Sequence, residues 1–223
     1  MAVPGSAGVW VATDDKRIAD EVTRFGGQVV MTSPDCANGT ERCADAVERL
    51  GEVAPVIVNL QGDAPLSPST LVPELVARLQ KDEGAAMATP AVRCTRPVLD
   101  HLLNDAREGR VGGTTSVFNR DGRALYFSKR VIPYVPGTLM DEPCPVYLHL
   151  GLYAYRPEAL ARYRAAPVST LERLEGLEQL RFLDMGSGVA VLAVERLSWD
   201  PIELNNPTDV PILERILCDH GIS

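Results

Sequence analysis

The first 92 residues alternate short apolar segments with longer amphipathic ones, and this alternation constrains the fold more than any other feature. The apolar segments, such as VIVNL, predict buried strands over residues 8–13, 28–32, 56–60 and 87–92. The segments between them carry apolar residues at helical spacing and predict helices over residues 16–25, 41–50 and 67–79. We therefore expect an α/β fold with a mostly parallel central sheet and helices on both faces.

The pattern changes after Arg93, where strands follow one another directly. A hairpin, a further strand, a helix, another strand and a last helix are predicted over residues 115–127, 146–155, 171–185, 189–194 and 210–218. Four prolines predict a loop over residues 131–145. We expect residues 1–223 to form one domain that carries residues 94–160 as an inserted lobe.

Composition excludes several classes of protein. The net charge of −8 disfavours a general nucleic-acid-binding protein. No apolar run is long enough to cross a membrane, and the start of the sequence lacks a signal-peptide pattern, so we expect a cytoplasmic protein. The five cysteines are scattered and include no CxxC pair, which predicts free thiols without a zinc site.

Polar segments follow the predicted strands at the places where ligands bind in open parallel sheets. Asp63 follows the strand VIVNL and a permissive glycine, so its carboxylate could reach a Mg²⁺ ion held by substrate phosphates. The alternative is that Asp63 only caps a helix or forms a turn. The loop at residues 38–41 could bind a base or phosphate through backbone N–H groups, or Thr40 could simply be a helix N-cap.

Two other sets of polar residues leave alternatives open. His149 lies in an apolar, alternating strand. A histidine there is either a core residue with its hydrogen bonds satisfied or a residue that contacts a substrate. Glu175, Glu178 and Arg181 are spaced by three on one predicted helix and could form a solvated face with local ion pairs. Spacing alone indicates an α/β enzyme that binds a nucleotide or another phosphate ligand.

Six segments, in order along nearly the whole chain, resemble motifs of one enzyme family. They are VATDD at 11–15, NGTER at 38–42, VNLQGDAP at 58–65, ALYFSKRVIPY at 124–134, HLGLYAYR at 149–156 and STLERLEGLEQLRFL at 169–183. Together they resemble the CMP-Kdo synthetases, which are 3-deoxy-manno-octulosonate cytidylyltransferases. The resemblance implies a fold of the nucleotide-diphospho-sugar transferase type, with the inserted lobe building the sugar pocket and a dimer contact.

The resemblance also implies an activity and a set of site residues. The activity would be Mg²⁺-dependent transfer of CMP from CTP to an acidic deoxy sugar, most simply Kdo, with release of pyrophosphate by a homodimer. The CTP-binding residues would be Asn38, Gly39, Thr40, Glu41, Arg42 and Gln61. The sugar-binding residues would be Lys129, His149, Tyr153, Glu178 and Gln179. Asp63 and Lys129 would be catalytic, and the metal would be held by Asp63 and Asn205.

The sequence departs from the family pattern at several places. The family's opening strand and its triphosphate loop, PARxxSxRLPGK, have no counterpart before VATDD, which indicates a truncated or mis-started chain whose sheet lacks its first strand. Asn205 stands where the family has a metal-binding aspartate, and Lys129 stands for an arginine. The sequence GGTTS at 112–116 replaces the run NPNxVKVV. These changes leave two alternatives: the same reaction on another sugar acid or a phosphonate, or a non-catalytic nucleotide-binding homologue.

Overall fold

The fold is given by a computed structural model, which describes residues 5–51, 54–62, 64, 66–136, 143–197 and 210–219. The strands are β1 (Trp10–Thr13), β2 (Gln28–Met31), β3 (Ile57–Leu60), β4 (Ala85–Arg93), β5 (Thr115–Phe118), β6 (Ala124–Ser128), β7 (Tyr147–His149), β8 (Leu152–Tyr155) and β9 (Gly188–Val194). The helices are α1 (Lys16–Arg24), α2 (Gly39–Leu50), α3 (Leu71–Lys81), α4 (Arg96–Arg107), α5 (Pro157–Ala165), α6 (Thr170–Glu175), α7 (Gln179–Asp184) and α8 (Val210–Asp219).

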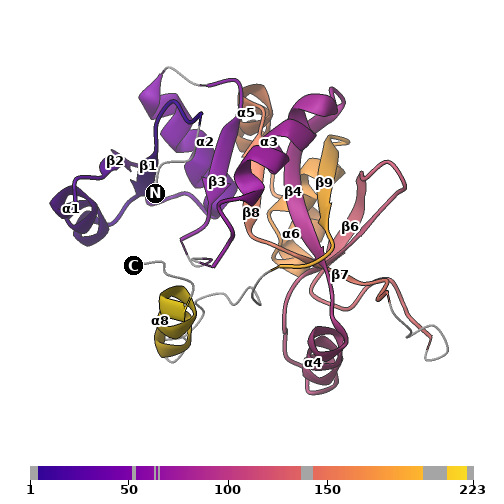
Figure 1. The fold of residues 1–223 in the computed structure, drawn as a ribbon. Coiled ribbons are helices and arrows are strands. Elements are labelled where there is room, and N and C mark those ends of the chain that lie inside the picture. Colours follow the sequence, from indigo (N-terminus) through magenta and orange to yellow (C-terminus); the bar gives the residue numbers. More distant parts are fainter. Residues whose placement is uncertain are drawn as a thin grey trace.

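The described strands form two sheets. β1 and β2 pair in parallel as a small sheet, which lies with α1 to the left of the main sheet in Figure 1. The main sheet has the order β3-β8-β4-β7-β5-β6, and β9 pairs with β4. Among the described strands β1 and β3 do not pair, although helix α2 contacts both of them. The resemblance had implied a sheet interrupted at this point.

The predicted α/β class is confirmed, but the strand pairing is more antiparallel than the sequence indicated. In the main sheet, β4 and β9 form the one parallel ladder between described strands. The predicted strand 146–155 is divided into β7 and β8, both of which run antiparallel to β4. β8 also pairs antiparallel with β3, so it separates two strands that would otherwise be parallel neighbours. Strand directions therefore alternate across this part of the sheet.

Two helices and one helix break were not predicted. Both α4 and α5 have a proline in the first turn, where the missing N–H costs no hydrogen bond. The predicted helix 171–185 is divided into α6 and α7 at Gly176, whose φ of 61° lies in the left-handed region that favours glycine. This break changes the direction in which the following side chains point.

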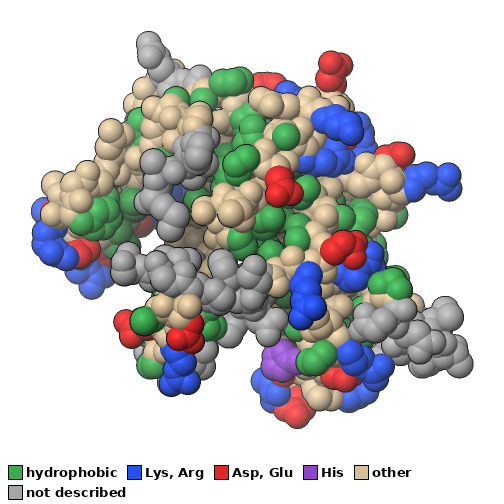
Figure 2. Space-filling view, viewed as in Figure 1, with side chains coloured by type: hydrophobic (Ala, Val, Ile, Leu, Met, Phe, Trp, Pro, Cys, Tyr) green, Lys and Arg blue, Asp and Glu red, His purple; other side chains and the backbone are tan. Residues whose placement is uncertain are grey.

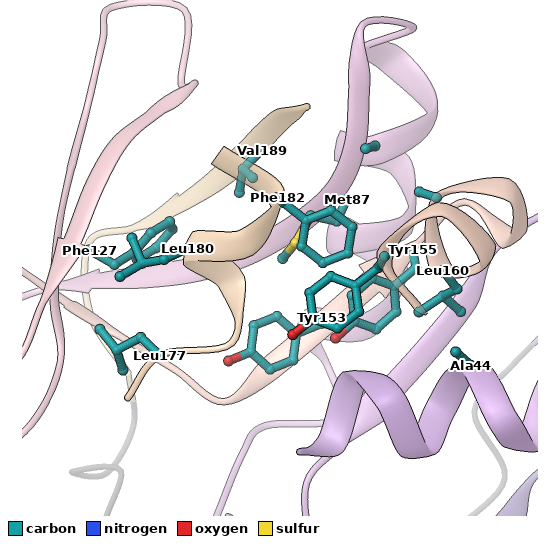
Figure 3. Close-up of a cluster of buried hydrophobic side chains, with 13 residues drawn as sticks. Ala44, Met87, Phe127, Tyr153, Tyr155, Leu160, Leu177, Leu180, Phe182 and Val189 are labelled. Atoms are coloured by element: carbon teal, nitrogen blue, oxygen red, sulfur yellow. The ribbon is translucent and has the colours of Figure 1, made fainter. Parts of the chain in front are cut away.

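The core on one face of the main sheet includes a row of aromatic rings. Tyr153 stacks on Tyr155 with ring centroids 5.8 Å apart, and Tyr155 stacks on Phe182 at 5.9 Å. Figure 3 shows these rings between α2 and the layer formed by α7, with Met87 and Leu160 beside them. Each fully buried large apolar side chain contributes about 1.5–3 kcal/mol, so this row fixes α2 and α7 relative to the sheet.

The surface is mixed in character. Figure 2 shows apolar side chains across the centre of the visible face and groups of both charge signs toward its rim. Among the described residues, no helix combines the length and apolarity needed to span a bilayer.

Candidate active site

The loop at residues 38–42 is held at the start of α2 by two reciprocal hydrogen bonds. Asn38 is the N-cap, because its Oδ1 accepts a hydrogen bond from the Glu41 backbone N–H at 2.9 Å. The Glu41 carboxylate in turn accepts from the backbone N–H of Ala37 at 2.8 Å. The expectation that Thr40 could be the N-cap is therefore wrong.

The next two residues show how tightly this loop is packed. Thr40 is buried, its Oγ1 shares a hydrogen bond with the Tyr155 hydroxyl at 2.8 Å, and its backbone N–H donates to the Glu178 carboxylate at 2.7 Å. A Cβ on Gly39 would lie 2.9 Å from Nε2 of Gln61, so only glycine fits without a shift there. The structure thus brings the loop and Gln61 together, as the resemblance implied.

Glu178 is the link between these two segments. One carboxylate oxygen accepts from Thr40 and the other accepts from Nε2 of Gln61 at 2.8 Å. Burial raises the pKa of the Glu178 carboxyl, and the hydrogen bonds from Thr40 and Gln61 oppose that shift. Glu178 was expected to face the sugar. Its oxygens accept hydrogen bonds from the two predicted nucleotide-side segments, and its contact with the sugar stays a prediction.

Arg42 completes the loop and faces the small sheet. Its guanidinium donates to Oγ1 of Thr32 at 2.7 Å and forms an ion pair with Asp14 at 2.9 Å. The motif VATDD therefore contributes a partner for NGTER, which joins the small sheet to the start of α2.

Arg181 lies behind the loop and was not expected to belong to the site. Its guanidinium donates to both carboxylate oxygens of Glu172 at 2.6 Å and to Oε1 of Glu41 at 2.9 Å. It also lies over the ring of Tyr163, 4.0 Å from the centroid. Arg181 is buried, so the interpretation of this segment as a solvated face is wrong. The signal available in the sequence was the motif itself, since spacing by three does not reveal the break at Gly176.

His149 is buried in the sheet and neutral. Burial lowers its pKa to about 3, and its Nε2 lies 2.9 Å from Oγ1 of Thr89. The single hydroxyl proton of Thr89 is directed to backbone carbonyls, including that of Leu152 at 2.9 Å. Nε2 must therefore carry the imidazole proton, which leaves Nδ1 as a hydrogen-bond acceptor. Tyr153, another predicted sugar-binding residue, packs beside the His149 ring, with the ring centroids 5.5 Å apart.

Lys129 follows β6 and is fixed through its backbone. Its N–H donates to Oε2 of Glu175 at 3.0 Å, and the neighbouring Ser128 hydroxyl donates to Oε1 at 2.8 Å. The Lys129 ammonium passes so close to Gly176 that a Cβ there would lie 2.8 Å from Nζ. The left-handed glycine therefore leaves space for the predicted catalytic lysine.

Two buried side-chain amide groups lack a hydrogen-bond partner within the described part of the chain. Nε2 of Gln179, a predicted sugar-binding residue, has no hydrogen-bond partner among the described residues. The same holds within the described ranges for Nδ2 of Asn59, which faces Gly39 and was not singled out from the sequence. Asn59 lies opposite Tyr153 in the β3–β8 ladder. Because a buried amide N–H normally has an acceptor, each of these groups can still donate a hydrogen bond.

The predicted metal ligands Asp63 and Asn205 both lie outside the described residues. Within the described part of the chain, no three His, Cys, Asp or Glu side chains are grouped as a metal site.

Comparison with known proteins decides the family. The family model described as cytidylyltransferase matches residues 4–190. A 3-deoxy-manno-octulosonate cytidylyltransferase from Maricaulis maris is 41% identical over 220 residues, covering 99% of this chain and 84% of the relative. Another, from Chlamydia felis, is 39% identical over 213 residues, covering 96% of this chain and 78% of the relative. The chain belongs to the 3-deoxy-manno-octulosonate cytidylyltransferase family.

A solved structure supports the same assignment. It is a CMP:2-keto-3-deoxy-manno-octonic acid synthetase complexed with CTP, with a TM-score of 0.81 and 30% identity over 98% of this chain and 83% of that chain. The cytidylyltransferase architecture expected from the sequence is therefore confirmed. The individual roles given to Asn38–Arg42, Gln61, Lys129 and His149 remain predictions within this family frame.

Proposed function

We propose that this chain transfers CMP from CTP to an acidic deoxy sugar, Kdo in the simplest case, and releases pyrophosphate. The observation that carries the proposal is the convergence of two segments on α6–α7. Glu178 holds the loop at 38–42 and Gln61, while Glu175 holds Lys129. One short segment thus contacts both the proposed nucleotide-side residues and a lysine whose charge suits a carboxylate.

In the proposed reaction a sugar hydroxyl oxygen attacks the α-phosphorus of CTP, and the bond from that phosphorus to the pyrophosphate oxygen breaks. The hydroxyl proton is released to solvent, so the products are CMP-sugar, pyrophosphate and one proton. Lys129 pairs with the sugar carboxylate, while Nδ1 of neutral His149 accepts a hydrogen bond from a sugar hydroxyl. A neutral histidine suits this task because it remains an acceptor throughout the physiological pH range.

We further propose that Mg²⁺ is the cofactor and that Asp63 and Asn205 hold it together with the CTP phosphates. A bound Mg²⁺ would neutralise phosphate charge as the α-phosphorus is attacked. The support is the sequence position of Asp63 after β3, beside Gln61, which the structure places next to the 38–42 loop. Asp63→Asn is expected to abolish Mg²⁺-dependent turnover without loss of fold by circular dichroism. Unchanged turnover would exclude Asp63 as a ligand.

The direct test measures pyrophosphate release from CTP and Mg²⁺ with Kdo, with UTP as the matched nucleotide control. Release with CTP and formation of CMP-Kdo would support the proposal. Release only with another sugar acid or a phosphonate would show that Kdo is not the acceptor. Lys129, which stands where the family has an arginine, is the reason for testing those other acids. CTP binding without release for any acceptor would favour the non-catalytic homologue.

A homodimer is proposed as the working state. The support is Leu125, which is 61% exposed on β6, the terminal strand of the main sheet. An exposed apolar residue on an edge strand is a common site of pairing between chains. Light scattering of Leu125→Lys against the unchanged chain tests this, because a dimer should shift toward monomer.

A further inference from the structure

The segment from Glu172 to Arg181 reaches both sides of the proposed site through carboxylates at successive spacings of three. Glu172 and Glu178 are directed to the nucleotide-side loop, and Glu175, which lies between them in sequence, is directed to Lys129. We propose that Arg181 with Glu172 positions the loop at 38–42 for the nucleotide, and that Glu175 positions Lys129 for the sugar acid. This inference rests on the proposed function.

On the nucleotide side, both side chains that build the cap of α2 also bind the ion pair behind it. Arg181 donates to Oε1 of Glu41, and Nδ2 of Asn38 lies 3.3 Å from Oε1 of Glu172. Nδ2 of Asn38 also donates to the Tyr163 hydroxyl at 3.0 Å. The side chains of Asn38 and Glu41 are therefore committed to the protein interior. Because the backbone N–H groups of Thr40 and Glu41 are also bonded within the protein, the loop is left with Gly39 to present to the nucleotide.

The burial of this cluster argues that it serves positioning more than stability. The Arg181 side chain is 2% exposed and that of Glu172 is 8% exposed. Buried ion pairs are commonly no better for stability than apolar residues of similar size, because removing two charges from water is costly. The planar Arg181 guanidinium, however, binds Glu172 and Glu41 at once and so fixes the orientation of the N-cap of α2.

On the acid side, Glu175 acts on Lys129 without touching its ammonium. It accepts hydrogen bonds from the Lys129 backbone N–H and from the Ser128 hydroxyl. The Ser128 hydroxyl oxygen also accepts from the backbone N–H of Arg130 at 3.0 Å. These bonds fix the backbone where β6 ends, and the space over Gly176 fixes the direction of the lysine side chain.

The two halves of the proposal predict opposite effects, so they can be separated. Arg181→Met should raise the KM for CTP at least about tenfold and leave the KM for the sugar acid within about twofold. Glu175→Ala should give the reverse pattern. Arg181→Lys keeps the charge but loses the fork, and it should give an intermediate KM for CTP. Arg123→Met removes an arginine–carboxylate pair with Asp82 elsewhere in the molecule and should leave both KM values unchanged.

Amide hydrogen exchange by NMR tests the same inference without any turnover. Because Arg181→Met also lowers global stability, it should speed exchange at the backbone N–H groups of Ala37 and Glu41 about tenfold more than at that of Lys129. Glu175→Ala should speed exchange at Lys129 and leave the other two unchanged. Arg181→Lys supplies the folded comparison if Arg181→Met unfolds.

The outcomes distinguish this inference from the function on which it rests. Pyrophosphate release absent in the unchanged chain, with the exchange pattern as predicted, would overturn the function and keep the positioning roles. Equal changes in both KM values, or exchange raised uniformly along the chain, would overturn the positioning roles and reveal a purely structural cluster.

Discussion

Two arginine–carboxylate clusters in this molecule use the same chemistry in different surroundings. Arg181 with Glu172 is almost fully buried behind the nucleotide-side loop. Arg123 with Asp82 has side chains 42% and 13% exposed, and the partly buried Arg78 also pairs with Asp82 and donates to the Gly122 carbonyl at 2.9 Å. Water cannot readily replace a lost partner in the buried cluster, whereas water can hydrate Arg123 if its partner is lost. The same contrast, between crowded groups at the site and open groups elsewhere, applies to histidines, glycines and cysteines in this chain.

The largest expected difference is between the two arginines. Arg181→Met leaves Glu172 and Glu41 without their cation, so we expect a loss of about 3–5 kcal/mol in the free energy of unfolding. Arg123→Met should cost about 1 kcal/mol or less, because water screens its pair. Urea denaturation of the two variants measures both values. Equal losses would show that burial does not separate the clusters.

The two histidines provide the next comparison. His149 has a pKa of about 3 in the folded protein because it is buried, whereas His101 is exposed on α4. Below about pH 6.5 the unfolded chain binds a proton at His149 and the folded chain does not, so stability is present above that pH and is lost as pH falls. Between pH 7 and pH 5 we expect a loss of about 2 kcal/mol from this group.

Denaturation curves at pH 7 and pH 5 test this contrast between the histidines. His149→Gln should remove that part of the pH dependence, and His101→Gln should leave it in place. An unaltered slope in His149→Gln would contradict the buried, neutral state of the imidazole.

Two glycines differ in the space around them. A Cβ on Gly39 would press against Gln61, while one on Gly62 would meet none of the described residues within 4 Å. Gly39→Ala should therefore displace Gln61 from Glu178 and weaken CTP binding about tenfold, or about 1.4 kcal/mol, with little change in unfolding. Gly62→Ala adds the same methyl group on the other side of Gln61 without that contact, so it should weaken CTP binding less than Gly39→Ala. Calorimetric titration with CTP gives both affinities, and equal values would show that the contact with Gln61 has no role in binding.

The cysteines differ in chemical reactivity, with no difference in stability or affinity expected. Burial, with a contribution from the nearby Glu178 carboxylate, raises the pKa of Cys43 to about 12, while Cys218 is exposed on α8. At pH 8, Cys218 should react with a thiol reagent at least about 100-fold faster than Cys43, because the thiolate is the reactive form. Mass spectrometry of labelled peptides resolves the two sites. Fast labelling of Cys43 would show that the start of α2 opens to solvent.

Most of the strands could be predicted because buried strands have contiguous apolar sequences, as in VIVNL. It did not predict which strands pair, since β8 lies between β3 and β4 for reasons of tertiary packing that no local pattern encodes. The start of α2 was placed two residues late, because Asn38 and Thr40 are both common caps and only geometry distinguishes them.

The site was predicted unevenly for a similar reason. The association of the 38–42 loop with Gln61 was implied by the family resemblance, and the structure brings these segments together. The solvated-face interpretation of Arg181 was wrong because residues spaced by three share a face only if the helix continues, and Gly176 ends it. Asn59 was missed because an amide in an apolar strand carries no sequence signal until its neighbours are known.

Nucleotide-side and acid-side contacts alternate along α6–α7, and this alternation affects how the sugar-acid specificity could be changed by design. Nucleotide-side and acid-side contacts follow one another at Glu172, Glu175 and Glu178. Inserting or deleting one residue in α6 would rotate the α6 carboxylates beyond it by about 100° and would shift the break at Gly176, which would disturb both substrates at once. Replacing one side chain leaves the others in register. Acceptor preference in this segment is therefore accessible to point substitution, while its length is fixed by the two loops that it serves.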